Sequence, residues 1–179
     1  MLSSIPLRFF IIFIPVVLFL HEMEEWNIVE FHRENYEIQF NETNMSERLW
    51  LFMLSLIGLF FSLLCNSINS TEIANSIFLI LSTFLLINGM QHLLLTITIK
   101  KYNPGFVFGG LIGTTIGIFY EMKLIIEDVV PLWIFLIITL IEFVPAFYDT
   151  IQSRRRKSLP NMIVQILRFA NFVERKLSE

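Results

Sequence analysis

Residues 5–26 read IPLRFFIIFIPVVLFLHEMEEW, an apolar run that ends in one histidine and three glutamates. A helix that crosses a bilayer needs about 20 mostly apolar residues. Four further runs of this kind follow, at residues 48–66, 73–99, 105–122 and 129–150. Of the 179 residues, 55% are hydrophobic, and they are gathered in these runs. The sequence therefore predicts an all-α integral membrane bundle of about five transmembrane helices.

A basic segment follows the last apolar run. We expect a transmembrane helical domain over residues 1–152 and a basic amphipathic tail over residues 153–179. Within the tail, Met162–Leu177 places apolar residues at helical spacing, which predicts an amphipathic helix on the cytoplasmic membrane surface. The four bases of Arg154–Lys157 would attract anionic lipid headgroups. They are not accompanied by a base-reading module, so we expect no nucleic-acid partner.

The distribution of basic residues predicts the orientation of the bundle. With five crossings, the segment 27–47, the turn at 100–102 and the C-terminal tail share one side, and the other side holds only Arg8 and Lys123. The positive-inside rule then places the tail in the cytoplasm and the N-terminus outside, in a multi-pass protein of the cell membrane. Because no small-residue cleavage site follows Leu20, we expect the first segment to be retained.

Polar side chains interrupt the apolar runs at a common depth. His21, Glu24 and Glu25 stand three and four residues apart, which places them on one face of a helix. Asn88 and His92 are four residues apart in the third run. At 1.5 Å per residue, His92 lies about 10 Å from the expected cytoplasmic end of its helix. We therefore expect these five side chains to meet near the cytoplasmic leaflet.

These buried polar groups point to a metal centre. Glu142 in the last run lies toward the same side, whereas Glu121 ends the fourth run on the opposite side. A histidine or glutamate inside a membrane must be neutralised, paired or coordinated. Imidazoles and carboxylates are ligands of divalent metals, and we favour zinc over iron or manganese. The expected ligands are His21, Glu25, His92 and Glu142.

Known zinc enzymes suggest roles for these residues. In the inverted H-x-x-E-H motif the two histidines bind the metal and the glutamate is the general base. Here Glu25 takes the place of the second histidine, and His92 completes a set of two histidines and one glutamate. Glu24 would then be the base that activates water, with Asn88 and Tyr102 as polarising donors.

Other interpretations of the same residues stay open. A His–Glu pair can be a neutral, hydrogen-bonded knot that only stabilises the bundle. A non-enzymatic protein could use the pocket to carry or bind a metal, protons or a lipophilic ligand. A carrier should show a second polar cluster near the outer face, where Glu121, Glu127 and Asp128 are the candidates and are expected in a loop. Glu22 and His32 are expected on a solvated surface.

Three short motifs follow one another along the chain: His21-Glu-Met-Glu-Glu25, Asn88-Gly-Met-Gln-His92 and Tyr102-Asn-Pro-Gly105. In this order they resemble the motifs of the HXXEE-domain family of small bacterial membrane proteins. The resemblance covers roughly residues 8–145 and does not include the basic tail. That family has no known function and is suspected to be enzymatic. The resemblance implies a shared site at His21, Glu24, Glu25, Asn88, His92 and Tyr102.

The function that these observations favour is that of a metal-dependent membrane enzyme. Its site lies among helices near the cytoplasmic leaflet, where an apolar molecule dissolved in the bilayer can reach it. We expect a hydrolase or isomerase of an apolar small molecule or lipid-like substrate. The sequence does not name the reaction.

Overall fold

The protein is described by a computed structural model that covers residues 5–37 and 43–178. Its described residues form helices and no strands, which confirms the predicted all-α class. The elements in chain order are α1 (Leu7–Glu24), α2 (Ile28–Asn35), α3 (Asn44–Ser67), α4 (Thr71–Ile99), η2 (Phe106–Gly113), α5 (Thr114–Ile126), α6 (Leu132–Arg156) and α7 (Asn161–Ser178).

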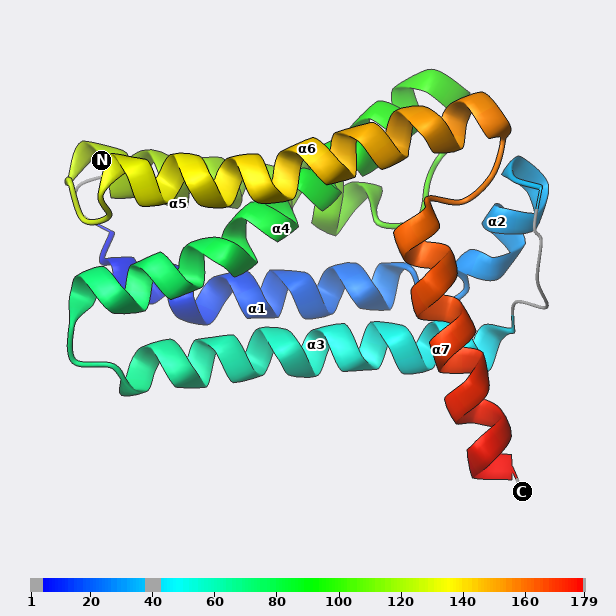
Figure 1. The fold of residues 1–179 in the computed structure, drawn as a ribbon, viewed down its shortest axis with the longest axis horizontal. Helices are drawn as coiled ribbons and strands as arrows, with labels where there is room; N and C mark the ends of the chain where they lie inside the picture. Colours follow the sequence, from blue (N-terminus) through cyan, green and yellow to red (C-terminus); the bar gives the residue numbers. More distant parts are fainter. Residues whose placement is uncertain (1–4, 38–42, 179) are drawn as a thin grey trace.

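The long helices form a bundle with two distinct ends (Figure 1). Helices α1, α3, α4 and α6 run along the long axis, as does α5, which continues directly from η2. The short helix α2 and the last helix α7 lie at the end where α1 stops, here called the α7 end. The connections from α3 to α4 and from α5 to α6 lie at the other end. The stretches predicted to share one side are therefore gathered at the α7 end.

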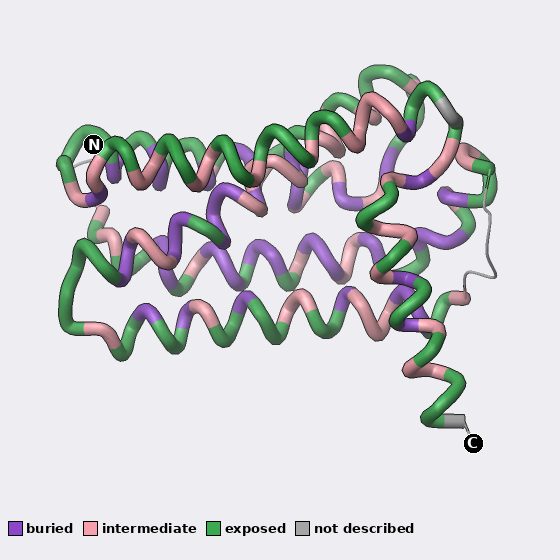
Figure 2. Tube along the Cα trace, in the orientation of Figure 1, coloured by how far each residue is buried: buried purple, intermediate pink, exposed green. Residues whose placement is uncertain are grey.

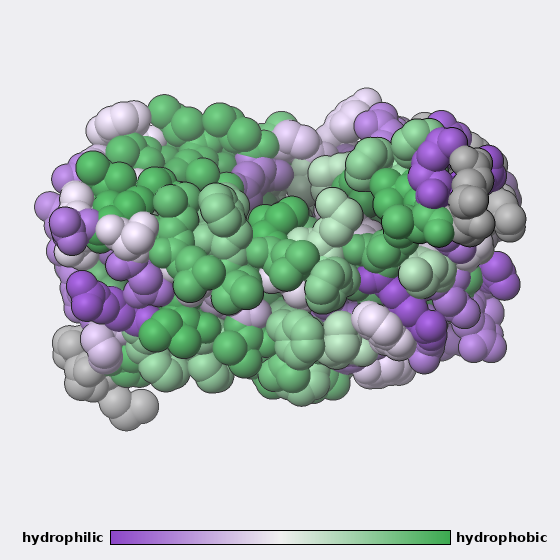
Figure 3. Space-filling view, turned by 90° about the horizontal axis from the view of Figure 1, so that it is seen from below, coloured by the Kyte–Doolittle hydropathy of each residue, from purple (hydrophilic) through white to green (hydrophobic). Residues whose placement is uncertain are grey.

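Four of the described helices are long and apolar enough to cross a membrane. They are α3, α4, the continuous helix Phe106–Ile126 and α6. Helix α1 contains Arg8, Glu22 and Glu24 and is not one of the four. The structure therefore supports four of the about five transmembrane helices that the sequence predicts. Seen from below, the surface is apolar across its middle and hydrophilic at both ends (Figure 3). This pattern is compatible with a multi-pass membrane protein.

The core of the bundle lies around α1 (Figure 2). Phe10, Ile14 and Leu18 of α1 are almost completely buried, and they belong to one core cluster with Phe78 and Tyr120. On the outside, α6 has no buried side chain before Ser153. Because α1 is the most enclosed helix, the histidine and glutamates at its C-terminal end are carried into the interior.

The segment after α1 lies at the α7 end of the bundle and was not predicted to be helical. Its short helix α2 packs against α3, and its residues Ile28, Val29 and His32 are buried. Thr43 then starts α3, because its side chain accepts a hydrogen bond from the Ser46 backbone N–H at 3.0 Å.

The predicted amphipathic helix is present as α7, and it lies across the long helices (Figure 1). It packs against α3 and α6, with Leu167 and Ala170 buried, while Phe169 and Phe172 remain exposed. Asp149 of α6 accepts hydrogen bonds from the first two backbone N–H groups of α7. One apolar face of α7 therefore packs on the bundle, and the apolar side chains of another face are exposed on the surface. Because α6 continues to Arg156, the expected boundary at residue 152 falls inside that helix.

Candidate metal centre

Two histidines and a glutamate converge at the α7 end of the bundle. His21 and Glu25 lie one turn apart at the end of α1, and His92 comes from α4. His92 Nε2 lies 3.0 Å from Glu25 Oε1, and His21 Nε2 lies 3.9 Å from the same oxygen. One ligand atom from each of the three side chains lies within 4.8 Å of the others. We call this group the His–Glu cluster.

Two asparagines border the His–Glu cluster. The amide of Asn88 lies 2.9 Å from His21 Nε2, and the amide of Asn103 lies 2.8 Å from His92 Nδ1. Asn103 is buried, and with its amide in the other orientation the oxygen would accept the Nδ1–H of His92. His92 would then present an unprotonated Nε2 toward Glu25. Asn103 was missed from the sequence, although it stands inside the third motif.

Glycines allow the backbone of η2 to approach the His–Glu cluster closely. A Cβ atom on Gly105 would lie 2.6 Å from Glu25 Oε1 and 2.7 Å from His92 Cε1, and its φ of +87° also favours glycine. A Cβ on Gly109 would lie 2.5 Å from His21 Nδ1. The π-helical turn that begins here is of a kind frequent at functional sites. The third motif thus forms one wall of the cluster.

Glu24 and Tyr102, predicted as general base and polarising donor, are not among the three side chains that converge. One Glu24 oxygen accepts the Val107 N–H at 2.9 Å and the Tyr102 hydroxyl, and the other accepts the Phe108 N–H at 2.8 Å. This carboxylate caps the positive end of η2, and both of its oxygens are engaged. Partial burial and the bond to Glu24 raise the pKa of the Tyr102 phenol to about 12. The structure therefore places Glu24 as an anchor for η2.

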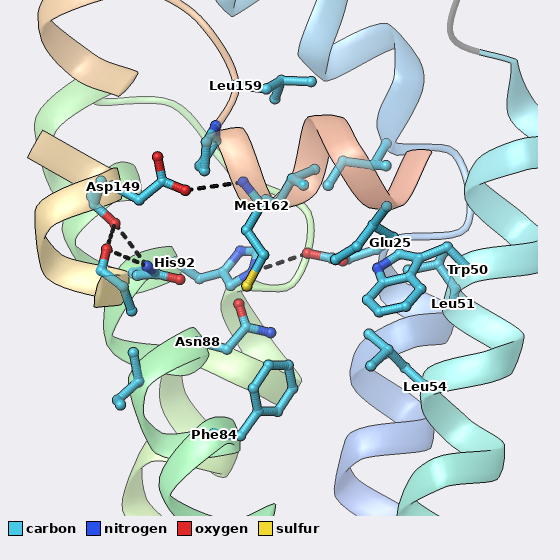
Figure 4. A pocket seen from close by; sticks show the side chains of 18 of the residues that line it. Glu25, Trp50, Leu51, Leu54, Phe84, Asn88, His92, Asp149, Leu159 and Met162 are labelled. Carbon is cyan, nitrogen blue, oxygen red and sulfur yellow. Dashed lines mark hydrogen bonds and ion pairs between the residues drawn. The ribbon is translucent and has the colours of Figure 1, made fainter. Parts of the chain in front are cut away.

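A cavity of about 580 Å³ adjoins the His–Glu cluster (Figure 4). Glu25 and His92 point toward each other at its polar end, with Asn88 beside them. Leu54 of α3 and Phe84 of α4 face its apolar part. Helix α7 lies over the polar end and contributes residues to the wall, among them Met162, Ile163 and Ile166. The volume falls in the range of about 300–1,000 Å³ that is typical of small-molecule sites.

Glu142 lines this cavity from α6 but does not join the ligand group at His21, Glu25 and His92. The structure therefore does not bring the expected fourth ligand to the other three. Gln91, on the same turn of α4 as His92, donates a hydrogen bond to Thr150 of α6 at 2.7 Å.

Two residues that were expected on a solvated surface are buried beside the cavity. Glu22 is 1% exposed, and neither of its carboxylate oxygens has a hydrogen-bond partner in the described part of the chain. His32 is 6% exposed, and its Nδ1 lies 3.4 Å from Glu47 Oε1 of α3. Glu22, His32 and Glu47 all line the cavity, so its polar end holds more carboxylates than the sequence predicted.

A second polar cluster lies in the other half of the bundle, around Glu121 of α5. The expectation of a loop at Glu121 was wrong, because this residue is in a helix and is 7% exposed. Its carboxylate accepts a hydrogen bond from Thr83 at 3.0 Å and a longer one from Ser82 at 3.5 Å. On the preceding residue, the Tyr120 hydroxyl donates to Asn75 at 2.9 Å.

The three motifs thus interlock through their side chains. Residues 12–120 match a family described as "Protein of unknown function with HXXEE motif". The chain belongs to this HXXEE family, which confirms the resemblance seen in the sequence. The matched region contains the first, second and third motifs. Comparison with curated proteins and with solved structures finds no match.

Proposed function

We propose that this protein is a metal-dependent membrane enzyme that hydrolyses or isomerises an apolar or lipid-like substrate. One observation carries the proposal: three ligand-type side chains converge within 4.8 Å at the end of a 580 Å³ cavity with mostly apolar walls. Buried ionisable groups in membrane segments usually serve a function. A pocket with a few convergent polar groups is the usual form of an active site.

The donor set fits a divalent ion. Two imidazole nitrogens and one carboxylate oxygen are the ligands of several catalytic zinc sites, which keep a further position open. Tetrahedral coordination at about 2.0–2.2 Å places neighbouring ligand atoms about 3.3–3.6 Å apart. The separations of 3.0 and 3.9 Å from Glu25 Oε1 lie on either side of this range. Zinc is favoured, and the same ligands would also accept iron or manganese.

A metal bound at the His–Glu cluster would supply Lewis-acid polarisation of a substrate carbonyl or of water. The other roles fall to residues of this chain. Asn103 holds the ring of His92, and the amide of Asn88 borders the cluster, where it can bind a polar group of the substrate. Glu22 lines the cavity, but both of its carboxylate oxygens are buried, so its side chain would have to turn toward a bound molecule to take the place of the engaged Glu24.

The membrane setting supports this assignment. The apolar helices are compatible with a site that is reached from the bilayer. We keep the orientation predicted from the basic residues, with the N-terminus outside and the α7 end at the cytoplasmic leaflet. In this orientation the run Arg154–Lys157 would meet anionic headgroups, and the exposed side chains Phe169 and Phe172 would enter the interface.

A metal or proton carrier is the second candidate, and one observation favours it. A carrier needs polar groups in both halves of the bundle, and Glu121 is a buried carboxylate in the half away from the His–Glu cluster. Its oxygen is already engaged by Thr83 and Ser82, and Glu121 is not part of the cavity wall. We therefore rank the carrier below the enzyme.

Reconstitution in liposomes separates the two functions. Protein is loaded with zinc and incubated with a mixture of membrane lipids and apolar esters, and products are identified by mass spectrometry. In parallel, a zinc-sensitive dye trapped in the liposomes reports metal flux. The enzyme predicts new products that disappear in the Glu25→Gln variant, without flux. Flux without product would reject the enzyme and support the carrier.

A further inference from the structure

The cavity beside the His–Glu cluster is elongated and has one polar and one apolar end. Its wall on α3 extends from Glu47 to Phe61, which at 1.5 Å per residue corresponds to about 20 Å. Polar residues gather where α7 crosses, and aliphatic and aromatic residues such as Leu54, Ile57 and Phe84 line the remainder. This lining matches a molecule with a polar head and a long hydrocarbon chain.

The apolar part of the cavity opens onto the outside of the bundle. Three residues that line it are also well exposed: Ile57 of α3 at 41%, Ile80 of α4 at 42% and Ile141 of α6 at 66%. All three belong to helices that can cross a membrane, so the opening faces hydrocarbon. At the polar end the cavity is instead covered by α7. A chain would therefore enter sideways from the bilayer.

The charges at the polar end select among possible headgroups. Arg154 is the one lysine or arginine in the cavity wall formed by the described residues. The carboxylates in that wall are Glu22, Glu25, Glu47, Glu142 and Asp149. Phosphate and carboxylate groups are bound by arginine, lysine or a free helix N-terminus, and the N-terminus of α7 is already occupied by Asp149. Carboxylates outnumber the arginine in this wall, so without a bound ion the polar end disfavours an anionic headgroup.

We infer that the cavity binds a neutral amphiphile from the bilayer, with an uncharged headgroup such as an ester, alcohol or amide at the His–Glu cluster and its hydrocarbon chain along Leu54 and Phe84. This inference rests on the proposed function, since the cluster is its catalytic end. The headgroup lies where Glu25, His92 and Asn88 face the cavity (Figure 4). Anionic phospholipids would remain at the membrane surface, where the exposed bases Arg155 and Lys157 can meet them.

The test is a binding titration of the full chain in phosphatidylcholine nanodiscs. The probe is a monoacylglycerol with a pyrene at the end of its chain, and the anionic comparison is an alkyl sulfonate with the same chain and label. Fluorescence anisotropy is measured with EDTA and, separately, with zinc. In EDTA we expect the neutral probe to bind at least about tenfold more tightly than the sulfonate, because like charges oppose the anion. With zinc the neutral probe should still bind.

Matched tryptophan variants locate the chain. Leu54→Trp fills the apolar part of the cavity and is expected to weaken binding about tenfold or more. Leu56→Trp is the control, because Leu56 is 48% exposed on the same helix and does not line the cavity. It should bind like the wild type.

The outcomes separate this inference from the proposed enzyme. Equal or tighter binding of the sulfonate to wild-type protein in EDTA would overturn the inference, whatever the folding of the variants. Equal weakening by both tryptophan variants would also overturn it. Binding of the neutral probe in EDTA, by protein that takes up no zinc, would instead sustain the amphiphile site and reject the metal enzyme.

Discussion

The two polar clusters of the bundle differ in the side chains they bring together and in whether a cavity adjoins them. Around Glu121, the carboxylate is bound by Thr83 and the neighbouring Tyr120 hydroxyl is bound by Asn75, in a closely packed part of the core. In the His–Glu cluster, three ligand atoms face one another across a short gap and a cavity adjoins them. The comparison indicates that hydrogen-bonded groups in a packed core stabilise a bundle, whereas convergent ligand-type groups beside a cavity form a candidate site.

The largest expected difference is between Glu25→Gln and Glu121→Gln. An amide at Glu25 keeps the shape of the side chain but removes the charge that a divalent ion needs. Zinc affinity should fall by more than about 100-fold, since even outer-shell changes cost about 10–100-fold. Isothermal titration calorimetry of detergent-purified protein measures this. Glu121→Gln should bind zinc like the wild type, and a comparable loss there would erase the distinction between the clusters.

A second pair of variants compares two asparagines, each of which is hydrogen-bonded to one side chain of its cluster. Asn103→Ala frees the ring of His92 and should lower zinc affinity about 10–100-fold. Asn75→Ala leaves the buried Tyr120 hydroxyl without its partner and should lower the free energy of unfolding by about 1–3 kcal/mol with unchanged zinc affinity. Zinc titration and thermal unfolding are measured on both variants. If Asn75→Ala weakened zinc binding as much as Asn103→Ala, the assigned roles would be wrong.

Adjacent glycines of η2 give a third contrast within the site. Gly109→Ala places a Cβ 2.5 Å from His21 Nδ1, so the ring or the backbone must move, and we expect a loss of about 1–3 kcal/mol in stability. Gly110→Ala meets its nearest side chains at 3.4 Å, an ordinary contact. Thermal unfolding of the two variants should therefore differ clearly. Equal stability of both would mean that His21 is not held against η2.

The smallest expected effect concerns the anchor of η2. The Tyr102 phenol has a pKa of about 12 when folded, above its ordinary value of 10.0, so folding favours the neutral form. Its stabilisation is complete below about pH 10 and is lost as the pH rises through about 12. Tyr102→Phe should remove this alkaline dependence and lower stability near pH 8 by about 0.5–1.5 kcal/mol. Unchanged alkaline unfolding in the variant would contradict the bond to Glu24.

The sequence predicted the parts of the fold that depend on apolar run length. It also grouped His21, Glu25, Asn88 and His92, because α1 and α4 run in the same direction and residues at equal depth on them meet. Spacing alone could not separate Glu24 from Glu25, since residues three and four positions after His21 share one face of a helix. The close approach of η2 decided between them by drawing Glu24 to its backbone N–H groups.

The buried surroundings of the site could not be predicted, because they depend on how segments outside the long helices fold back. Glu22 and His32 stand in a polar stretch of the sequence, yet both are buried, and His32 lies on α2, which packs against α3. Asn103 did carry a signal, since it stands between Tyr102 and Pro104 in the third motif. For α7, the pattern predicted the amphipathic helix but not that it would cover the cavity.

The most direct test of the central claim is the metal content of the purified protein. Wild-type protein, His92→Ala and Thr83→Ala are equilibrated with zinc, dialysed and analysed by inductively coupled plasma mass spectrometry. We expect about one zinc ion per chain in the wild type and in Thr83→Ala, and almost none in His92→Ala. A folded wild type that holds no metal, or a His92→Ala variant that holds as much as the wild type, would contradict a metal site at the His–Glu cluster.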